Sequence, residues 1–99
     1  MIDFERINAA ALPVLPALVA RWLPGGQHRG REYVALNPNR ADRRPGSFRI
    51  NTRSGAWADF ATGDRGGDPI SLAAFLFNIS QADAARRLAG MLGIPENSP

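Results

Sequence analysis

The sequence contains no cysteine, no lysine and only one histidine, His28. Without thiols it can form neither a disulfide nor a thiolate zinc site, and it lacks a cysteine nucleophile. No serine stands at a recognisable catalytic spacing from His28, and a single loop histidine is usually just solvated, so we assign it no role. The glycine-rich stretch 63–67 lacks the Lys-Ser/Thr pair of a phosphate-binding P-loop. We therefore expect no enzymatic activity.

Long apolar runs are also missing. No stretch approaches the roughly 18 apolar residues needed to cross a bilayer. Near the N-terminus stand Asp3 and Glu5, where a signal peptide would be basic. We expect a single cytoplasmic domain with one modest core and no membrane partner.

All twelve basic residues are arginine, and the net charge is +3. A GC-rich coding bias is one explanation for the missing lysine. Distribution is more informative, because eight arginines lie in residues 29–65 against four acidic residues there. The planar guanidinium donates two hydrogen bonds to phosphate and stacks on bases, so a cluster of this kind favours a polyanionic partner.

Residues 1–29 predict a helical segment interrupted by proline. We expect a first helix capped by Asp3, a break near Leu12 and a second helix from Pro13 to Leu23. An interior proline such as Pro16 removes a helical hydrogen bond and clashes one turn back, so one continuous helix is excluded.

Residues 30–68 alternate short apolar runs with turn residues, which is typical of a small antiparallel sheet of three or four strands. Ser54-Gly55 is suited to a hairpin turn. The expected strand residues are Tyr33, Ala35 and Leu36, then Phe48 and Ile50, then Trp57 and Phe60.

Residues 69–94 predict two helices that close the core. Asp68 is a suitable N-cap with Pro69 at the first helical position, Ser80 opens the second helix, and Gly93 ends it. Residues 95–99 are expected to be a frayed tail. The predicted fold class is α+β: a small ribbon-like sheet flanked by N-terminal and C-terminal helices.

Four motifs follow one another along this chain, and their order carries a resemblance. They are Asn37-Pro38-Asn39-Arg40, Pro45-Gly46-Ser47-Phe48, the run from Trp57 to Gly63, and Gly67-Asp68 before an apolar helix. The series resembles the N-terminal zinc-ribbon (Cys-His-Cys-Cys) domain of bacterial and phage DNA primases, in a form that has lost the zinc ligands. In that family the pattern reads C-P-x-H, a basic loop, P-S-F, C-x-x-C and G-D. The resemblance covers about two-thirds of the chain, residues 30–94.

By position, the four ligands of that family correspond to Asn37, Arg40, Asp59 and Thr62. Arginine cannot ligate a metal, and asparagine, threonine and one carboxylate are poor ligands for zinc. We predict a metal-free ribbon without a cofactor. Arg40 and Asp59 could form a salt bridge in place of the ion, with Asn37 and Thr62 satisfying its other hydrogen bonds; two independent surface residues are the alternative. If the pair is buried, Asp59→Ala should destabilise the protein by roughly 3 kcal/mol in a melt.

The resemblance implies contact with template DNA through the sheet face and the basic loop. The residues it implicates are Arg31, Arg40, Arg43, Arg44, Arg49, Arg53, Arg65 and Trp57. Phe60, Phe48 and Tyr33 are further aromatic platforms, although Phe48 fits the core better than the surface.

We therefore expect a non-catalytic domain that binds single-stranded DNA in the replication of a phage, plasmid or other mobile element. It would act within a larger primase-helicase or as a small subunit beside a polymerase. The alternative is a protein-interaction adaptor that docks a replicative polymerase, primase or helicase through its apolar helices or Trp22, without touching DNA.

Overall fold

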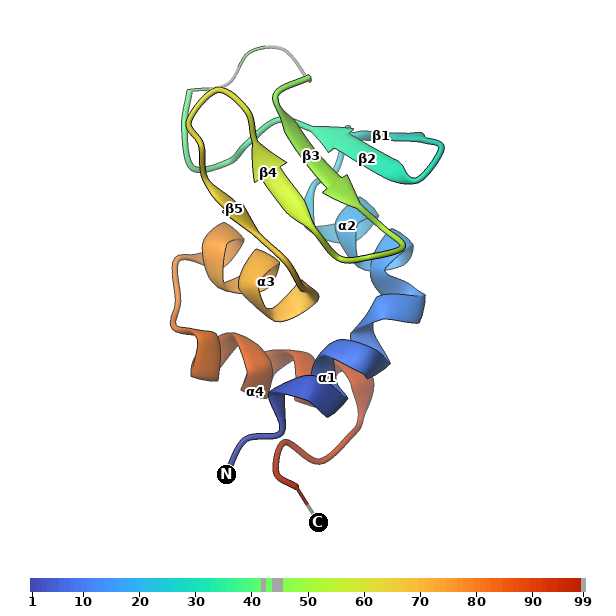
Figure 1. Cartoon of the computed structure of the whole chain (residues 1–99), viewed down its shortest axis with the longest axis vertical. Coiled ribbons are helices and arrows are strands. Elements are labelled where there is room, and N and C mark those ends of the chain that lie inside the picture. The colour runs from blue at the N-terminus through green and yellow to red at the C-terminus, as the bar shows by residue number, and fades with distance from the viewer. Residues whose placement is uncertain (42, 44–45, 99) are drawn as a thin grey trace.

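The structure is a computed structural model that describes residues 1–41, 43 and 46–98. Helices lie at both ends of the chain and a sheet lies between them (Figure 1). The elements in chain order are α1 (Phe4–Ala11), a short 3-10 turn η1 (Leu12–Val14), α2 (Leu15–Trp22), β1 (Gln27–Arg29), β2 (Glu32–Ala35), β3 (Phe48–Asn51), β4 (Trp57–Asp59), β5 (Arg65–Gly66), α3 (Pro69–Phe77) and α4 (Gln81–Leu92).

The N-terminal helical segment is interrupted at Pro13, as its sequence predicts. The Asp3 side chain accepts a hydrogen bond from the Arg6 amide at 3.1 Å, so the expected cap is confirmed. The break is the turn η1, which contains Pro13. The second helix consequently begins at Leu15, two residues later than expected, with Pro16 in its first turn, where a missing N–H costs nothing.

The described residues form one antiparallel sheet of five strands in the order β1-β2-β3-β4-β5. Three or four strands were expected, and the additional ones are short. The polar β1 has no apolar alternation and is a strand only because it pairs with β2 across a turn in which Gly30 has φ +62°. The second short strand, β5, pairs Gly66 with Trp57. The β3–β4 connection is longer than a two-residue hairpin: the Asn51 amide donates to the Ala56 carbonyl at 2.7 Å.

The core lies between one face of the sheet and the helices. On β2 and β3, Tyr33 pairs with Ile50 and Ala35 with Phe48, and all four side chains are buried. Leu36 and Phe60, expected in strands, lie one residue beyond β2 and β4 and are exposed.

Local capping defines the C-terminal helices as expected. Asp68 accepts a hydrogen bond from the Ser71 amide at 2.8 Å and Pro69 opens α3. At the end of α3, Asn78 adopts a left-handed conformation. Ser80 Oγ accepts from the Asp83 amide at 3.0 Å, and Gly93 ends α4 with φ +69°. Most of α3 is buried, in agreement with its apolar sequence.

The prediction that the C-terminal tail is frayed is wrong for the described residues up to 98, because they pair with the N-terminal residues. The Asp3 amide donates to the Glu96 carbonyl at 2.9 Å, and Ile2 forms an antiparallel bridge with Asn97. Both chain ends consequently lie together beyond α1 and α4, away from the sheet (Figure 1). Among the described helices, none combines the length and apolar character required to traverse a bilayer.

Candidate nucleic-acid interface

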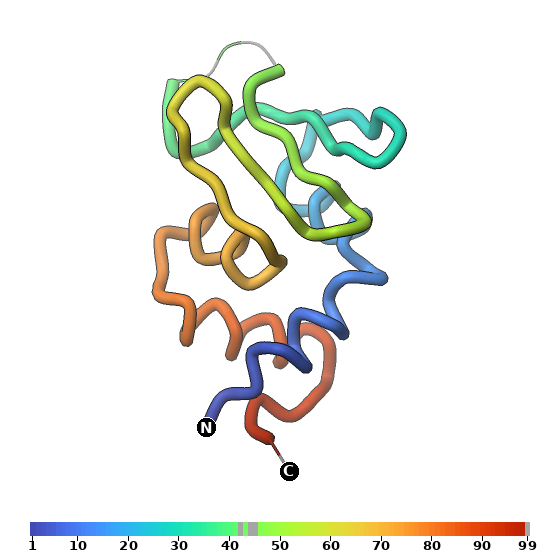
Figure 2. The backbone as a smooth tube through the Cα atoms, in the orientation of Figure 1, coloured from blue at the N-terminus to red at the C-terminus, as the bar shows by residue number. Residues whose placement is uncertain are grey.

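The connection between β2 and β3 places Asn37 and Arg40 beside the end of β4. The tube in Figure 2 shows this connection passing behind β3 and β4 to the β5 side of the sheet. There the Asp59 side chain is fully buried and accepts two hydrogen bonds from Arg40. Arg40 Nε donates to Oδ2 at 2.7 Å, and Arg40 Nη2 donates to Oδ1 at 3.3 Å. Asn37 Nδ2 donates to Oδ2 at 2.7 Å. The expected Arg40–Asp59 salt bridge is confirmed, and the alternative of two independent surface residues is wrong. We call Asn37, Arg40 and Asp59 the clasp.

Thr62 does not belong to the clasp, contrary to the prediction. Its side chain is exposed, and its hydroxyl donates to Asp64 Oδ2 at 2.8 Å. The main-chain amide of Ala61 instead donates to Asp59 Oδ1 at 2.8 Å. This happens because the chain turns tightly after β4: the Gly63 amide donates to the Asp59 carbonyl, and Gly63 has φ +85°. The Ala61 main-chain amide therefore donates the hydrogen bond to Asp59 that was expected from the Thr62 hydroxyl.

Asp59 stays ionised at neutral pH. Burial alone would raise the pKa of this carboxyl. Hydrogen bonds from Arg40, Asn37 and the Ala61 amide, together with the Arg40 charge, lower it further than burial raises it. The resulting pKa of Asp59 is about 2, compared with an ordinary value of 3.8.

The residues at the four corresponding positions do not fit a zinc ion. Asp59 already accepts four N–H bonds on its two oxygens. Arg40 brings a positive charge to the place where a cation would sit, and Thr62 is directed to Asp64. Within the described part of the chain, no three side chains of the histidine, cysteine, aspartate or glutamate type come together. Hydrogen bonds and an ion pair thus join the β2–β3 connection to the end of β4.

A second asparagine, Asn39, links the β2–β3 connection to helix α3 through hydrogen bonds. Asn39 Nδ2 donates to the Phe75 carbonyl at 2.6 Å, and Asn78 Nδ2 donates to Asn39 Oδ1 at 2.9 Å. Sequence reasoning missed both roles. The available signal was Asn78 itself, because asparagine at a helix C-terminus tolerates the left-handed conformation and leaves its amide free to reach a neighbouring loop.

The strand register gathers a row of side chains on the face of the sheet opposite the core, which we call the open face. Val34 pairs with Arg49, Arg49 with Ala58, and Ala58 with Arg65, so all four share this face. Val34 is buried, Ala58 is half-buried and Arg65 is exposed. Arg49 is held in place: Nη1 lies 3.2 Å from Glu32 Oε1 and Nε donates to the Gly46 carbonyl at 2.8 Å. The open face therefore presents one oriented guanidinium group, that of Arg49, with the exposed Arg65 in the same row.

A shallow depression of about 170 Å³ lies on the open face. It is lined by Glu32, Arg49, Asn51, Ala56, Trp57, Ala58 and Phe60. Phe60 is 73% exposed, which is unusual for a large aromatic side chain. It therefore offers its ring to solvent beside Arg49.

The remaining predicted arginines fall around the sheet. Arg31 is in the β1–β2 turn, and the Thr52 amide donates to its carbonyl, which brings this turn next to the loop that carries Arg53. Arg43 is exposed in the β2–β3 connection. Arg40 is committed to the clasp, and the predicted Arg44 lies outside the described residues. The strand register places Arg49 and Arg65 in one row on the open face. The other described arginines of the predicted set lie at the two ends of the sheet.

The prediction that Trp57 stacks on bases is wrong. Its side chain is 6% exposed, its Nε1 donates to Ser71 Oγ at 2.9 Å, and its ring lies 4.6 Å from that of Phe75. Phe48 and Tyr33 are buried as well. Of the four aromatic residues considered, Phe60 alone is accessible, because it lies on the same side of β4 as Ala58 and opposite Trp57.

This arrangement of sheet and helices has a counterpart among solved structures. A crystal structure of the Aquifex aeolicus primase, comprising zinc-binding and RNA polymerase domains, matches 98% of this chain with a TM-score of 0.80. The fold is primase zinc-ribbon-like. The identity is 22%, so the likeness concerns the fold alone, and this chain spans 23% of the primase chain. Neither a family model nor a curated protein matches the sequence.

Proposed function

We propose that this primase-like domain is a non-catalytic module that binds single-stranded DNA across the open face of its sheet. One observation carries the proposal: an exposed aromatic ring, Phe60, stands beside Arg49 in a depression on that face. A stacking ring next to guanidinium groups is the combination that single-strand-binding proteins use, since every base has a π-face and every nucleotide a phosphate.

The position of the two groups favours a single strand over a duplex. Phe60 can stack only on a base whose face is open, and duplex bases are stacked on each other. Arg49 and Arg65 lie in one register row across three strands, so a chain of phosphates running across the sheet would meet both. Arg43 and Arg53, at the two ends of the sheet, extend the path.

The likeness to a primase supports a setting in DNA replication. We propose that the replicating molecule is that of a phage, plasmid or other mobile element. There the domain would serve a larger primase-helicase or stand beside a polymerase as a small subunit. Catalysis would belong to another domain, because this one offers a binding face and a structural clasp.

Binding to a fluorescent oligothymidylate of about 12 nucleotides, followed by anisotropy, tests the proposal. We expect Phe60→Ala to weaken binding by about 5- to 140-fold, which corresponds to one lost stacking contact of ~1–3 kcal/mol. The matched control is Phe4→Ala, which removes another exposed phenylalanine from α1. With about four phosphates contacted, log K should fall against log salt with a slope near −3.

Replacing Arg65 by Gln should weaken all oligonucleotide sequences about equally, because phosphate contacts carry no base information. Equal losses for Phe60→Ala and Phe4→Ala would contradict the stacking assignment. No binding even at low salt, together with a stable complex with a polymerase or primase, would instead favour the adaptor function.

A further inference from the structure

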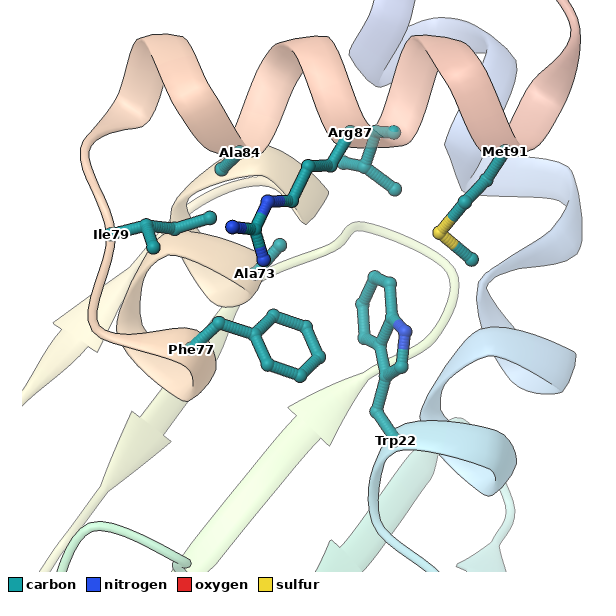
Figure 3. A pocket seen from close by; sticks show the side chains of 8 residues that line it. Trp22, Ala73, Phe77, Ile79, Ala84, Arg87 and Met91 are labelled. Atoms are coloured by element: carbon teal, nitrogen blue, oxygen red, sulfur yellow. The ribbon is translucent and has the colours of Figure 1, made fainter.

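A groove among helices α2, α3 and α4 has no role in the proposed DNA contact. Its volume is about 180 Å³. Its lining residues are Trp22, Ala73, Phe77, Ile79, Ala84, Arg87, Leu88 and Met91 (Figure 3).

The groove exposes large apolar side chains to solvent. Trp22 and Phe77 meet edge to face with ring centroids 5.7 Å apart and form one wall. Phe77 is 44% exposed and Met91, on the facing helix α4, is 48% exposed. Apolar side chains gathered around a hollow, as opposed to scattered singly, are typical of a surface that another molecule covers.

One charged side chain, Arg87, reaches into this apolar surrounding. Figure 3 shows its guanidinium directed over the groove, between Ile79 and Phe77. None of the lining residues has a carboxylate. Asp83, one turn earlier on α4, bonds to Arg86 at 3.2 Å, and Glu96 also lies 3.7 Å from Arg86. Within the part of the chain described by the structure, Arg87 has no ion-pair partner, while its neighbour Arg86 has two.

We propose that this groove docks a short acidic peptide segment of a partner protein. One bulky apolar side chain of the segment enters between Trp22 and Met91, and an adjacent carboxylate pairs with Arg87. The volume suits this, because a cavity of roughly 150 Å³ lined by apolar side chains accepts a benzene-sized group. A guanidinium at the edge of an apolar groove pairs with a carboxylate through two charge-assisted hydrogen bonds, with little competing water.

A second copy of this chain fits the groove less well. In a symmetric dimer the same patch meets itself, so the two Arg87 side chains would approach each other with no carboxylate in either lining. Like charges brought together in this way oppose association. An acidic partner, in contrast, brings a carboxylate that can pair with Arg87.

A random dodecapeptide library displayed on phage, panned on the immobilised full chain, tests the proposal without prior choice of ligand. We expect enriched peptides to combine aspartate or glutamate with a phenylalanine, tryptophan, leucine or isoleucine. The most enriched peptide, synthesised and titrated by calorimetry, should bind Arg87→Gln at least about tenfold more weakly, as for loss of a charge-assisted hydrogen bond. The matched control is Arg86→Gln, on the same helix but outside the groove lining, and it should bind within about twofold of the parent.

Met91→Glu provides a second variant, because it places a negative charge opposite the incoming carboxylate. It should abolish peptide binding while leaving oligothymidylate binding unchanged, so the groove and the sheet face are tested separately. Enriched peptides without an acidic excess, no enrichment over uncoated support, or equal losses in Arg87→Gln and Arg86→Gln would each overturn the proposal. So would a dimer in sedimentation that Met91→Glu dissociates, since that would assign the groove to a second copy.

Discussion

At the scale of single residues, Asp59 joins the end of β4 to the connection between β2 and β3. It receives two donors from Arg40, one from Asn37 and one from the main chain. Its own side chain is inaccessible, whereas Arg40 is 27% exposed. Removing the carboxylate would delete the acceptor of these four N–H bonds from a buried place, which is the physical reason for the ~3 kcal/mol loss expected of Asp59→Ala.

The clasp makes stability depend on pH in the acid range. The pKa of Asp59 is depressed from 3.8 to about 2, so its contribution is complete above about pH 4 and is lost as the pH falls toward 2. Allowing for solvent screening near Arg40, we expect the parent to lose about 1–2 kcal/mol more than Asp59→Asn across this range. Urea unfolding at a series of pH values measures the difference. Parallel curves for the two proteins would contradict the role of the ionised carboxylate.

The clasp was predicted from the resemblance to the primase ribbon, and the parts of the prediction that failed have local causes. Arg40 and Asp59 are opposite charges at two of the positions that correspond to the zinc ligands of that family, so a salt bridge was one of two interpretations and two independent surface residues were the other. Thr62 was misassigned because the direction of a side chain in a tight turn depends on main-chain angles that residue type does not reveal. Trp57 was misassigned because strand alternation tells which residues share a face but not which face becomes the core.

At the scale of elements, strand β5 and helix α3 approach each other at Gly66. A Cβ added to Gly66 would overlap the Trp57 indole and lie 2.5 Å from Ser71 Oγ, the two groups that hydrogen-bond to each other. The absence of a side chain at Gly66 therefore allows Trp57 to reach Ser71 in the first turn of α3. This contact joins the sheet to the first C-terminal helix.

We accordingly predict that Gly66→Ala destabilises the protein by about 1–3 kcal/mol, the range for inserting a methyl group into a packed site. The neighbouring Gly67→Ala is the control, because a Cβ there has no atom within 4 Å. Thermal melts of the two variants should differ clearly. A loss for Gly67→Ala as large as that for Gly66→Ala would show that the main chain, and not the Trp57 contact, is responsible.

Helices were better predicted than strands because their signals are local. Asp3, Asp68 and Ser80 cap helices through hydrogen bonds to residues three positions later, a pattern that can be read directly. The strands β1 and β5 are polar or glycine-containing and exist only through pairing with a neighbour. Pairing depends on the whole fold, so neither strand could be recognised beforehand.

At the scale of the whole molecule, the fold resembles a zinc-binding one, but the residues that the structure describes bring together no three histidine, cysteine, aspartate or glutamate side chains that could hold a metal ion. We predict that prolonged treatment with EDTA leaves the melting temperature unchanged and that the purified protein contains far less than one equivalent of zinc. The reason is that the Asp59 oxygens are already saturated by N–H donors. Melts before and after EDTA treatment check the first point and elemental analysis checks the second; stoichiometric metal that survives dialysis would refute the metal-free clasp.

The two proposed surfaces occupy different elements. The open face is built from β2, β3, β4 and β5, whereas the groove is built from α2, α3 and α4. A chain bound on the sheet and a peptide bound between the helices would therefore not compete for the same side chains. The net charge of +3 suits both, because each proposed ligand is negative.

The pairing of Ile2 with Asn97 brings the two chain ends side by side, remote from the sheet (Figure 1). A peptide linker could therefore join them with little strain, and the domain could be circularised or reopened at an exposed loop without rearranging its interior. For the same reason, a neighbouring polypeptide fused at either end would extend from the same pole. The arginine-bearing surface would remain uncovered whichever end carried the fusion.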